Sequence, residues 1–259
     1  MSAGHAHPLY RDGESSAHRL APEVKIVCLV IFVLAVVGTP RNMFWPFAIY
    51  ALIVFIVWEI ARIPLRWMLP RMVIEAPFLI LAVLLPFAEG GERIEVAGLR
   101  LSSTGLYAAW GIVVKGTLGV AASLTVAATT TSRELPVALS RLGVPGAVTS
   151  ILVLMIRYID LLAAEANRMR MARLSRGDSP RALHQAAAIA RSVGVLFIRA
   201  YERGERVYVA MMSRGFDGAV PALAVGVGSS APASARQWTV ALLPAAAAVA
   251  VAASAWALR

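Results

Sequence analysis

The sequence predicts an all-α integral membrane protein with about five transmembrane helices and a long amphipathic helical region on the cytoplasmic side. Of its 259 residues, 59% are hydrophobic and 15% are charged, whereas soluble domains carry about 25% charged residues. The net charge is +10. In a membrane protein, such an excess of Lys and Arg first indicates which loops stay in the cytoplasm. Because the basic residues alternate with long apolar runs, we expect no nucleic-acid partner.

Composition divides the chain into five segments. A polar N-terminal segment on the cytoplasmic side is followed by a membrane domain of four spans, a cytoplasmic region of amphipathic helices, a linker rich in Pro, Ser, Gly and Ala, and a last transmembrane helix. These segments cover residues 1–22, 23–131, 132–218, 219–236 and 237–259. The first apolar run lacks a good cleavage site and further spans follow it, so we interpret it as a retained span rather than a signal peptide.

The loops between the apolar runs indicate the orientation of the chain. The five runs cover about 24–38, 44–60, 72–87, 105–131 and 239–258. The loop after the second run holds three arginines and no acidic residue, whereas the loop after the third holds three glutamates against two arginines. Since basic loops remain inside, we expect a multi-pass protein of the cell inner (plasma) membrane with a cytoplasmic N-terminus.

The region 132–218 differs from the spans because it is amphipathic. From Arg157 to Arg214 there are eleven arginines against five acidic residues. Apolar residues at helical spacing predict a helix over 148–172. A second helix is expected to begin after Asp178-Ser179-Pro180 and to run to Ser213, with Gly194 as a weak point. A sixth span results if 145–158 or 189–200 enters the bilayer.

Each of these two helices is expected to end at the same tripeptide. The first copy is Ser175-Arg176-Gly177 and the second is Ser213-Arg214-Gly215. Glycine is common where a helix ends on a left-handed residue, so both copies are interpretable as caps with an arginine near the negative end of the helix dipole. The alternative is that both arginines reach carboxylates or carbonyls of a partner that has two equivalent sites.

Other candidate residues are few. Lys115 lies within the fourth apolar run, where a lysine is either functional or reaches the interface with its long side chain. His5 and His7 are weak candidates for binding a transition metal, and with His18 they are otherwise ordinary solvated residues. The single cysteine, Cys28, excludes an intramolecular disulfide and is interpreted as a small hydrophobic side chain.

Several catalytic motifs are absent from the sequence. It contains no GxxxxGK[ST] phosphate loop, so we do not expect the chain to hydrolyse a nucleotide. It also contains no HExxH, no GxSxG and no dense cluster of His, Asp and Glu within the spans. We therefore expect neither a cofactor nor an enzymatic activity.

Taken together, these residues resemble the transmembrane T component of energy-coupling factor (ECF) transporters, and within it the cobalt-type CbiQ family. The segment HRLAPEVK resembles the family's His-Arg-Leu-x-Pro-x-x-Lys motif before the first span. PFLILAVLLPF and TTTSRELPVALSRLGVP resemble the third span and the segment after the fourth. The two Ser-Arg-Gly tripeptides resemble the family's pair of Ala-Arg-Gly signatures at the ends of two coupling helices, with Ser in place of Ala.

The resemblance implies a non-catalytic coupling subunit. Its partners would be two ATP-binding subunits (a CbiO-like ATPase dimer) and a substrate-capture membrane subunit (CbiM-like, with a CbiN-like small subunit). Arg176 and Arg214 would each dock on one ATPase, and the transported species would be cobalt or nickel ions. Two alternatives stay open at this point. One is the same role in a vitamin transporter, and the other is a membrane enzyme or assembly factor whose basic helices lie on membrane lipid.

Overall fold

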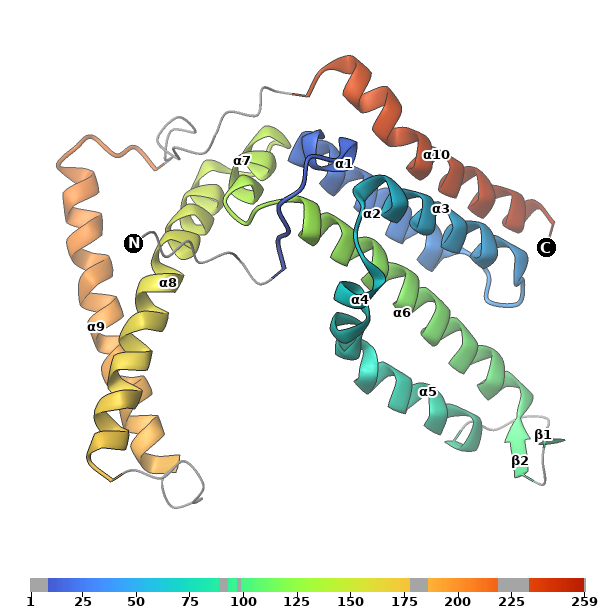
Figure 1. Cartoon of the computed structure of the whole chain (residues 1–259), viewed down its shortest axis with the longest axis horizontal. Helices are drawn as coiled ribbons and strands as arrows, with labels where there is room; N and C mark the ends of the chain where they lie inside the picture. The colour runs from blue at the N-terminus through green and yellow to red at the C-terminus, as the bar shows by residue number, and fades with distance from the viewer. Residues whose placement is uncertain (1–8, 89–92, 97–98, 178–185, 219–232, 259) are drawn as a thin grey trace. The chain divides into compact units, whose positions relative to one another are not determined.

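The structure is a computed structural model that describes residues 9–88, 93–96, 99–177, 186–218 and 233–258. The chain divides into two compact units. Within the described ranges, one unit contains helices α7, α8 and α9, and the other contains the remaining elements (Figure 1). The all-α prediction is confirmed, with one addition. Strands β1 (Arg93–Val96) and β2 (Leu99–Ser102) form a short antiparallel hairpin in the acidic loop, with Arg93 opposite Ser102.

The larger unit is built around a long central helix, α6. Its helices are α1 (Ser16–Arg19), α2 (Pro22–Gly38), α3 (Trp45–Ala61), α4 (Leu65–Met68), η1 (Leu69–Glu75), α5 (Ala76–Ala88), α6 (Ser103–Thr129) and α10 (Ala235–Ala257). Helix α6 packs against α2, α3 and α5, while α10 packs against α2 and α3. Each of the five predicted spans therefore corresponds to a helix. The third begins earlier than predicted because α4 and η1 directly precede α5 in one continuous helical stretch.

Helix lengths show which spans cross a bilayer unaided. Among the described residues, four stretches are long and apolar enough to cross: Leu65–Phe87, Ser103–Thr129, Gly146–Ser175 and Ala235–Ala257. Helices α2 and α3 have 17 residues each, or about 26 Å at 1.5 Å per residue, against a hydrocarbon core of about 30 Å. Helices of this length, if they span the bilayer, end within or close to the apolar layer, where backbone carbonyls need partners.

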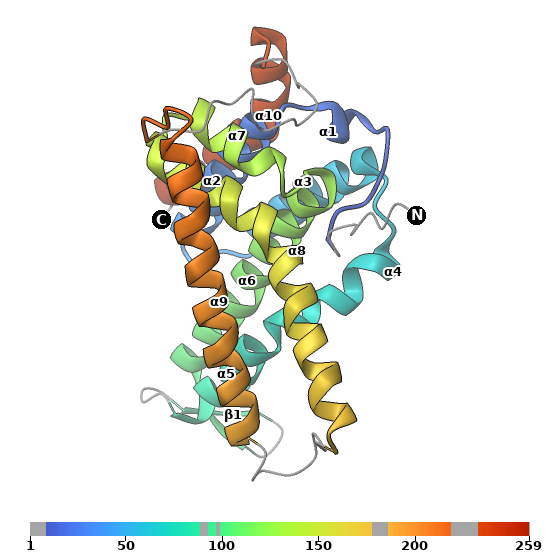
Figure 2. The same ribbon diagram turned by 90° about the vertical axis from the view of Figure 1, so that its left-hand side faces the viewer.

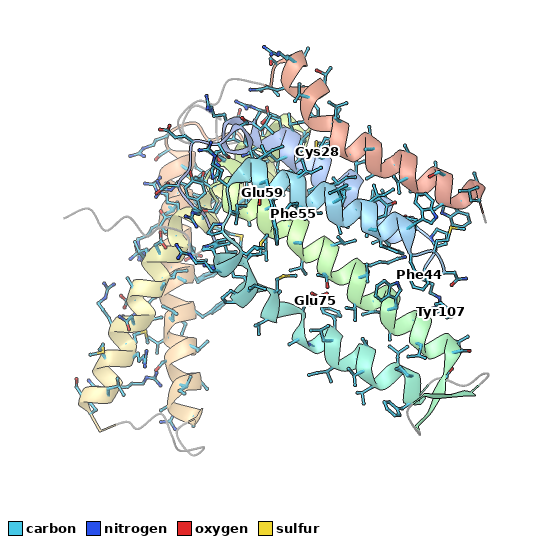
Figure 3. The ribbon with its side chains drawn as sticks, turned by 45° about the vertical axis from the view of Figure 1, so that its right-hand side comes forward. Cys28, Phe44, Phe55, Glu59, Glu75 and Tyr107 are labelled. Carbon is cyan, nitrogen blue, oxygen red and sulfur yellow. The ribbon has the colours of Figure 1, made fainter. Side chains whose placement is uncertain are left out.

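The core of this unit lies where α2, α3, α6 and α10 meet. Tyr50 of α3 is fully buried there, and its ring makes edge-to-face contact with Phe32 and Phe47. The Tyr50 hydroxyl lies 2.8 Å from the Thr39 hydroxyl and donates to the Ala248 carbonyl oxygen at 3.4 Å. The Cys28 thiol, half-buried on α2, donates to the Ala241 carbonyl of α10 at 3.1 Å (Figure 3). These bonds join the last helix to the first spans.

Helix α3 ends in an uncommon conformation. Arg62 caps it with φ 54° and ψ 42°, and it is the only non-glycine residue with positive φ in the described part of the chain. Its N–H donates to the Glu59 carbonyl, and the Ile63 N–H donates to the Trp58 carbonyl. This pair of bonds is the pattern that glycine usually completes. A side chain in this left-handed region costs about 1 kcal/mol, so Arg62 occupies a position at which glycine would be more stable.

The smaller unit is a helical hairpin preceded by a short helix. Helix α7 (Glu134–Arg141) packs against α8 (Gly146–Ser175), and α8 packs against α9 (Ala186–Met212). The two long helices run in opposite directions (Figures 1 and 2), and their ribbons cross in the view of Figure 1. Helix α9 continues through Gly194 without interruption. The predicted helix start at Asp178-Ser179-Pro180 lies outside the described residues.

Candidate functional site: the two Ser-Arg-Gly ends

The first Ser-Arg-Gly tripeptide terminates α8. Ser175 is the last helical residue, Arg176 is the cap, and Gly177 has φ +84°. The Gly177 N–H donates to the Leu174 carbonyl at 3.1 Å, and the Arg176 N–H donates to the Arg173 carbonyl at 3.0 Å. The left-handed glycine turns the chain away from the helix axis. Arg176 is thereby left exposed at the end of the helix.

The second tripeptide directly follows the end of α9 and also contains a left-handed glycine. Gly215 has φ +80°. Its N–H donates to the Met212 carbonyl at 3.0 Å, and the Phe216 N–H donates to the Met211 carbonyl at 3.1 Å. These two bonds are the complete Schellman motif, in which the residue after the left-handed glycine closes back on the helix. Arg214 directly precedes its glycine, as Arg176 does, and is also exposed, although α9 ends at Met212, one residue before the tripeptide.

The serine of each tripeptide binds only its own helix among the described residues. The Ser175 hydroxyl donates to the Met171 carbonyl at 3.0 Å, and the Ser213 hydroxyl donates to the Ala210 carbonyl at 3.0 Å. Both bonds are local ones that serine commonly makes to a preceding turn. Neither hydroxyl bonds to an arginine among the described residues, so we expect Ser in place of Ala to leave the position of each arginine unchanged.

An ion-pair cluster joins the two helices that carry these ends. The Glu165 carboxylate of α8 accepts hydrogen bonds from Arg168 of the same helix and from Arg199 of α9. Arg176 lies eleven residues beyond Glu165, or about 16 Å along α8, and Arg214 lies fifteen residues beyond Arg199, or about 22 Å along α9. Because the helices are antiparallel, the two arginines lie on opposite sides of the cluster.

The stretches considered for a sixth span have different outcomes. Residues 145–158 fall at the start of α8, and α8 as a whole is long and apolar enough to cross a bilayer. Residues 189–200 fall in α9, which is not among the four helices of the described chain that meet this criterion. Helix α8 thus combines an apolar first half with a basic second half that ends at Arg176.

Lys115 makes contacts within the protein. Its Nζ atom donates to the carbonyls of Val37 and Thr39, both at 2.8 Å. The carbonyl between them, that of Gly38, accepts from the Trp256 indole at 2.9 Å. These three carbonyls end helix α2 and have no partner within the helix itself. Lys115 therefore closes a short helix, a role that neither of its two sequence interpretations included.

The His-Arg-Leu-x-Pro-x-x-Lys motif holds the N-terminal segment on the end of α6. Lys25, which is buried, donates from Nζ to the Thr129 carbonyl at 2.7 Å and to the His18 carbonyl at 3.3 Å. The Arg11 N–H donates to the Ala128 carbonyl at 3.0 Å. The His18 ring lies between the Ser15 hydroxyl (2.6 Å) and the Arg11 carbonyl (3.0 Å). Burial, opposed in part by the Arg11 carbonyl, lowers the pKa of His18 below its usual value.

Glu75 is a buried carboxylate that the sequence interpretation missed. It ends η1, within the stretch Leu65–Phe87, and is 3% exposed. Its two oxygens accept from the Thr117 hydroxyl at 3.0 and 3.1 Å, and it points toward α6 (Figure 3). A Cβ at Gly116 would lie 2.5 Å from Oε1. The signal in the sequence was a lone acidic residue in an apolar run, because such residues face the protein interior and tend to be functional.

The described residues offer no cluster for a resident metal ion. No group of three or more His, Cys, Asp or Glu side chains suited to a metal occurs among them. His5 and His7, the weak metal candidates, lie outside the described residues. The predicted function assigns ion handling to a partner subunit, so a metal ion here would be cargo rather than a cofactor.

Comparison with known proteins identifies the family. Residues 13–223 match the CbiQ family, described as cobalt transport protein. An uncharacterized protein of Methanocaldococcus jannaschii is 28% identical over 76% of this chain and 70% of its own length. The energy-coupling factor transporter transmembrane protein EcfT of Staphylococcus aureus is 26% identical over 78% of this chain and 80% of its own length.

A fused protein provides a further comparison. A protein of Methanocorpusculum labreanum, named as a fused cobalt transport protein CbiMQ, is 28% identical over 53% of this chain. The chain spans about a quarter of that protein's length, since the match covers 24% of it. The family match extends from the His18 motif through both Ser-Arg-Gly ends. The chain therefore belongs to the CbiQ family of cobalt transport proteins and is a multi-pass transmembrane component of an energy-coupling factor transporter.

Proposed function

We propose that this chain is the coupling subunit of an ECF-type importer of cobalt or nickel ions. It would transmit movement of two CbiO-like ATPase subunits to a CbiM-like capture subunit accompanied by a CbiN-like small subunit. The observation that carries the proposal is the similar construction of the two Ser-Arg-Gly ends. Each presents an exposed arginine at a glycine-terminated helix end, and two equivalent arginines suit a partner with two equivalent subunits.

Arginine suits this docking for a physical reason. Its planar guanidinium has five N–H donors in a rigid arrangement. These donors bind a carboxylate or several carbonyls with a defined geometry. At a capped helix end the side chain extends beyond the last turn. The side chain is therefore able to enter a groove of the partner while the helix stays outside the groove. Arg176 and Arg214 would each enter a groove of one ATPase subunit, on the cytoplasmic side of the inner membrane.

The crossing of α8 and α9 would transmit the movement. The Glu165 cluster joins the helices between the two arginine ends. When ATP closes the ATPase dimer, its grooves approach each other and displace both ends. Two stiff helices joined near the middle convert that displacement into a change of crossing angle, and α8 carries the change into its apolar first half. The same change would tilt or release the capture subunit.

Two alternatives to this function can be distinguished from it by experiment. A vitamin importer would use the same coupling device, because the substrate would be chosen by the capture subunit; identification of the co-purified capture subunit decides between them. A membrane enzyme or assembly factor with a basic lipid-surface helix would use the arginines only as charge. Such binding falls with any arginine removed and with added salt, whereas docking depends on two particular arginines.

The test replaces both arginines in the full transporter. Arg176→Ala combined with Arg214→Ala should abolish co-purification of the ATPase subunits and cobalt uptake, while the protein still inserts into membranes. The matched control is Arg170→Ala with Arg203→Ala, which removes two exposed arginines of the same helices away from their ends. Equal loss in the control would support the lipid-surface alternative. Unchanged ATPase association in the first variant would contradict the proposal.

A further inference from the structure

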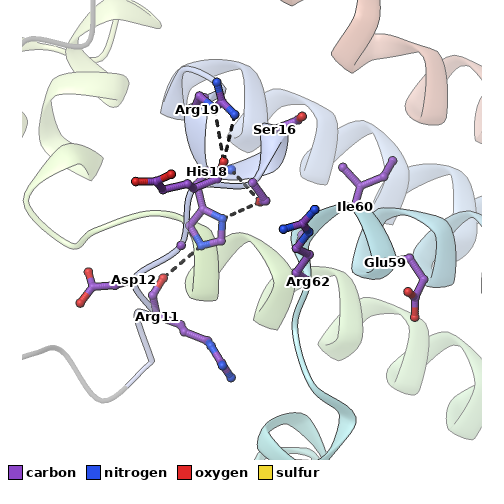
Figure 4. Close-up of a pocket in the computed structure, with 12 residues that line it drawn as sticks. Arg11, Asp12, Ser16, His18, Arg19, Glu59, Ile60 and Arg62 are labelled. Atoms are coloured by element: carbon purple, nitrogen blue, oxygen red, sulfur yellow. Dashed lines mark hydrogen bonds between the residues drawn. The ribbon is translucent and has the colours of Figure 1, made fainter.

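We propose that the junction of α3 with the N-terminal loop is a binding site for one membrane phospholipid whose headgroup carries a phosphate and a primary ammonium group. The site is a hollow of about 850 Å³ in the larger unit (Figure 4). It is lined on one side by the loop from Arg11 to Arg19 and on the other by the end of α3, from Glu59 to Arg62. This inference does not depend on the proposed transport function.

Arg62 is the first observation that points to a ligand. It holds a left-handed conformation that glycine adopts without strain. Its guanidinium makes no hydrogen bond or ion pair with any described residue, and it lines the hollow. Figure 4 shows it between the end of α3 and the loop that carries His18. An arginine where glycine would be less strained, with a guanidinium that no described residue engages, indicates a role for the side chain outside the fold.

The charges around Arg62 indicate the chemistry of the headgroup. Arg11 also lines the hollow, and its guanidinium has no partner in the part of the chain that the structure describes, whereas Arg19 donates to the Glu14 carbonyl at 3.2 and 3.3 Å. The Arg62 guanidinium is therefore available to a phosphate, whereas that of Arg11 points away from Arg62 (Figure 4). Carboxylates also line the hollow, since Asp12, Glu14 and Glu59 belong to the lining and are exposed. A site with both signs of charge fits a zwitterionic headgroup better than a purely anionic one.

An apolar stripe on α3 leads into the hollow and indicates a lipid. Leu52, Phe55, Ile56 and Ile60 are 49–56% exposed and share one face at spacings of three and four residues. Glu59 lies on the same face, as the labels of Phe55 and Glu59 show in Figure 3. From Leu52 to Ile60 the stripe measures about 12 Å, close to one leaflet of a hydrocarbon core of about 30 Å. Ile60 belongs both to the stripe and to the lining.

The N-terminal loop is held firmly enough to form one wall. His18 bonds to Ser15 and Arg11, and the Arg11 N–H bonds to the end of α6. A Cβ at Gly13 would lie 2.8 Å from the His18 ring, so this loop packs closely on the ring. These bonds hold the loop wall of the hollow on itself and on the end of α6.

The experiment measures lipid binding to the purified full chain in detergent by native mass spectrometry and by thermal unfolding with added lipid. Phosphatidylethanolamine, phosphatidylcholine and phosphatidylglycerol with identical acyl chains are compared. We expect phosphatidylethanolamine to bind most tightly. Arg62→Gly should weaken it by about tenfold or more, as expected for a lost charge-assisted hydrogen bond. Arg66→Ala, an exposed arginine outside the hollow, should leave binding unchanged.

Arg62→Gly separates binding from folding. It relieves the left-handed strain, so the lipid-free protein should unfold at the same or a higher temperature while losing lipid affinity. Glu59→Gln should remove the preference for ethanolamine over choline and retain binding. Unchanged ethanolamine-lipid binding by Arg62→Gly would overturn the proposal. So would equal binding of all three lipids, tighter binding of phosphatidylglycerol, or the same stabilisation by soluble glycerophosphoethanolamine, which has no acyl chain.

Discussion

Lys25 and Lys115 each donate hydrogen bonds to the carboxyl end of the helix that carries the other. Lys25, in the first turn of α2, reaches the Thr129 carbonyl at the end of α6, and Lys115 of α6 reaches the Val37 and Thr39 carbonyls at the end of α2. Both ends of this antiparallel pair are thus closed by a positive charge from the neighbouring helix. A cation at a helix carboxyl end is favourable because it opposes the helix dipole.

This reciprocal arrangement gives the first prediction. Lys25→Met and Lys115→Met keep most of the apolar stem and remove the donor, so each should lower the free energy of unfolding by about 1–3 kcal/mol, as for a buried hydrogen-bonding group left without its partner. The two sites lie at opposite ends of α2, so the double variant should show additive losses. Thermal and chemical unfolding in detergent measure both. A double variant no less stable than either single variant would contradict independent closure of the two ends.

The second prediction concerns the close approach of Glu75 to α6. Gly116→Ala should be destabilising because the new Cβ would lie 2.5 Å from the Glu75 carboxylate. In a Glu75→Ala background the same change should cost little, since the obstructing carboxylate is gone. The double-mutant cycle should therefore give a coupling energy of about 1–3 kcal/mol. Gly119→Ala is the matched control, because nothing lies within 4 Å of a Cβ there. Equal effects of Gly116→Ala in both backgrounds would rule out this contact.

These two contacts show which features the sequence could predict. The Ser-Arg-Gly ends are local: every backbone bond that forms the second cap lies within six consecutive residues, from Met211 to Phe216. A glycine after an amphipathic run therefore indicated the structure by itself. The acceptors of Lys115 lie 78 and 76 residues earlier in the chain, and Thr117 lies 42 residues after Glu75. Polar partners within a membrane domain depend on helix packing, which periodicity does not specify.

The hollow at Arg62 was beyond prediction for a related reason. The arginines at 62, 66 and 71 indicated only a basic loop and its cytoplasmic side. The left-handed conformation of Arg62 arises because Ile63, 8% exposed, packs with Ala61 into a small cluster that also contains Ala17 and Ala128. Tertiary packing therefore sets the direction of the chain after α3, and Arg62 adopts the left-handed conformation that this direction requires.

The third prediction is a loss of stability in acid that depends on His18. Burial lowers the pKa of His18 in the folded protein, and the charges of Lys25 and Arg11 also lower it, while the hydrogen bond to the Arg11 carbonyl and the charge of Asp12 oppose this shift in part. The unfolded chain therefore takes up a proton near pH 6.5 while the folded protein stays neutral. Stability from this group is complete above pH 6.5 and falls as the pH drops through the lower folded pKa.

The measurement compares thermal unfolding at pH 8, 6.5 and 5. Wild type should lose more stability between pH 8 and pH 5 than His18→Gln does, because the variant has no titrating group at this position. The comparison cancels the effects of other titrating residues, which both proteins share. A difference between wild type and variant that stays the same at all three pH values would show that His18 contributes nothing through its protonation.

The fourth prediction uses glycines of one helix to test the cap geometry. Gly215→Ala places a side chain at φ +80° and should destabilise the end of α9 by about 1 kcal/mol. Gly194→Ala, inside the same helix with open space around its Cβ, should instead stabilise by about 0.5–1 kcal/mol, because alanine loses less conformational freedom than glycine in a helix. Hydrogen exchange of the α9 amides and thermal unfolding report both effects.

A further pair of double variants distinguishes the role of these glycines from that of the serines two positions before them. Ser175→Ala and Ser213→Ala remove hydroxyls that bond only to their own helix among the described residues, so stability and ATPase association should both stay close to wild type. Gly177→Ala with Gly215→Ala should weaken ATPase association, because the cap that directs Arg176 and Arg214 beyond the helix ends is altered at both positions. If the serine pair lost association while the glycine pair kept it, the hydroxyls rather than the caps would position the arginines.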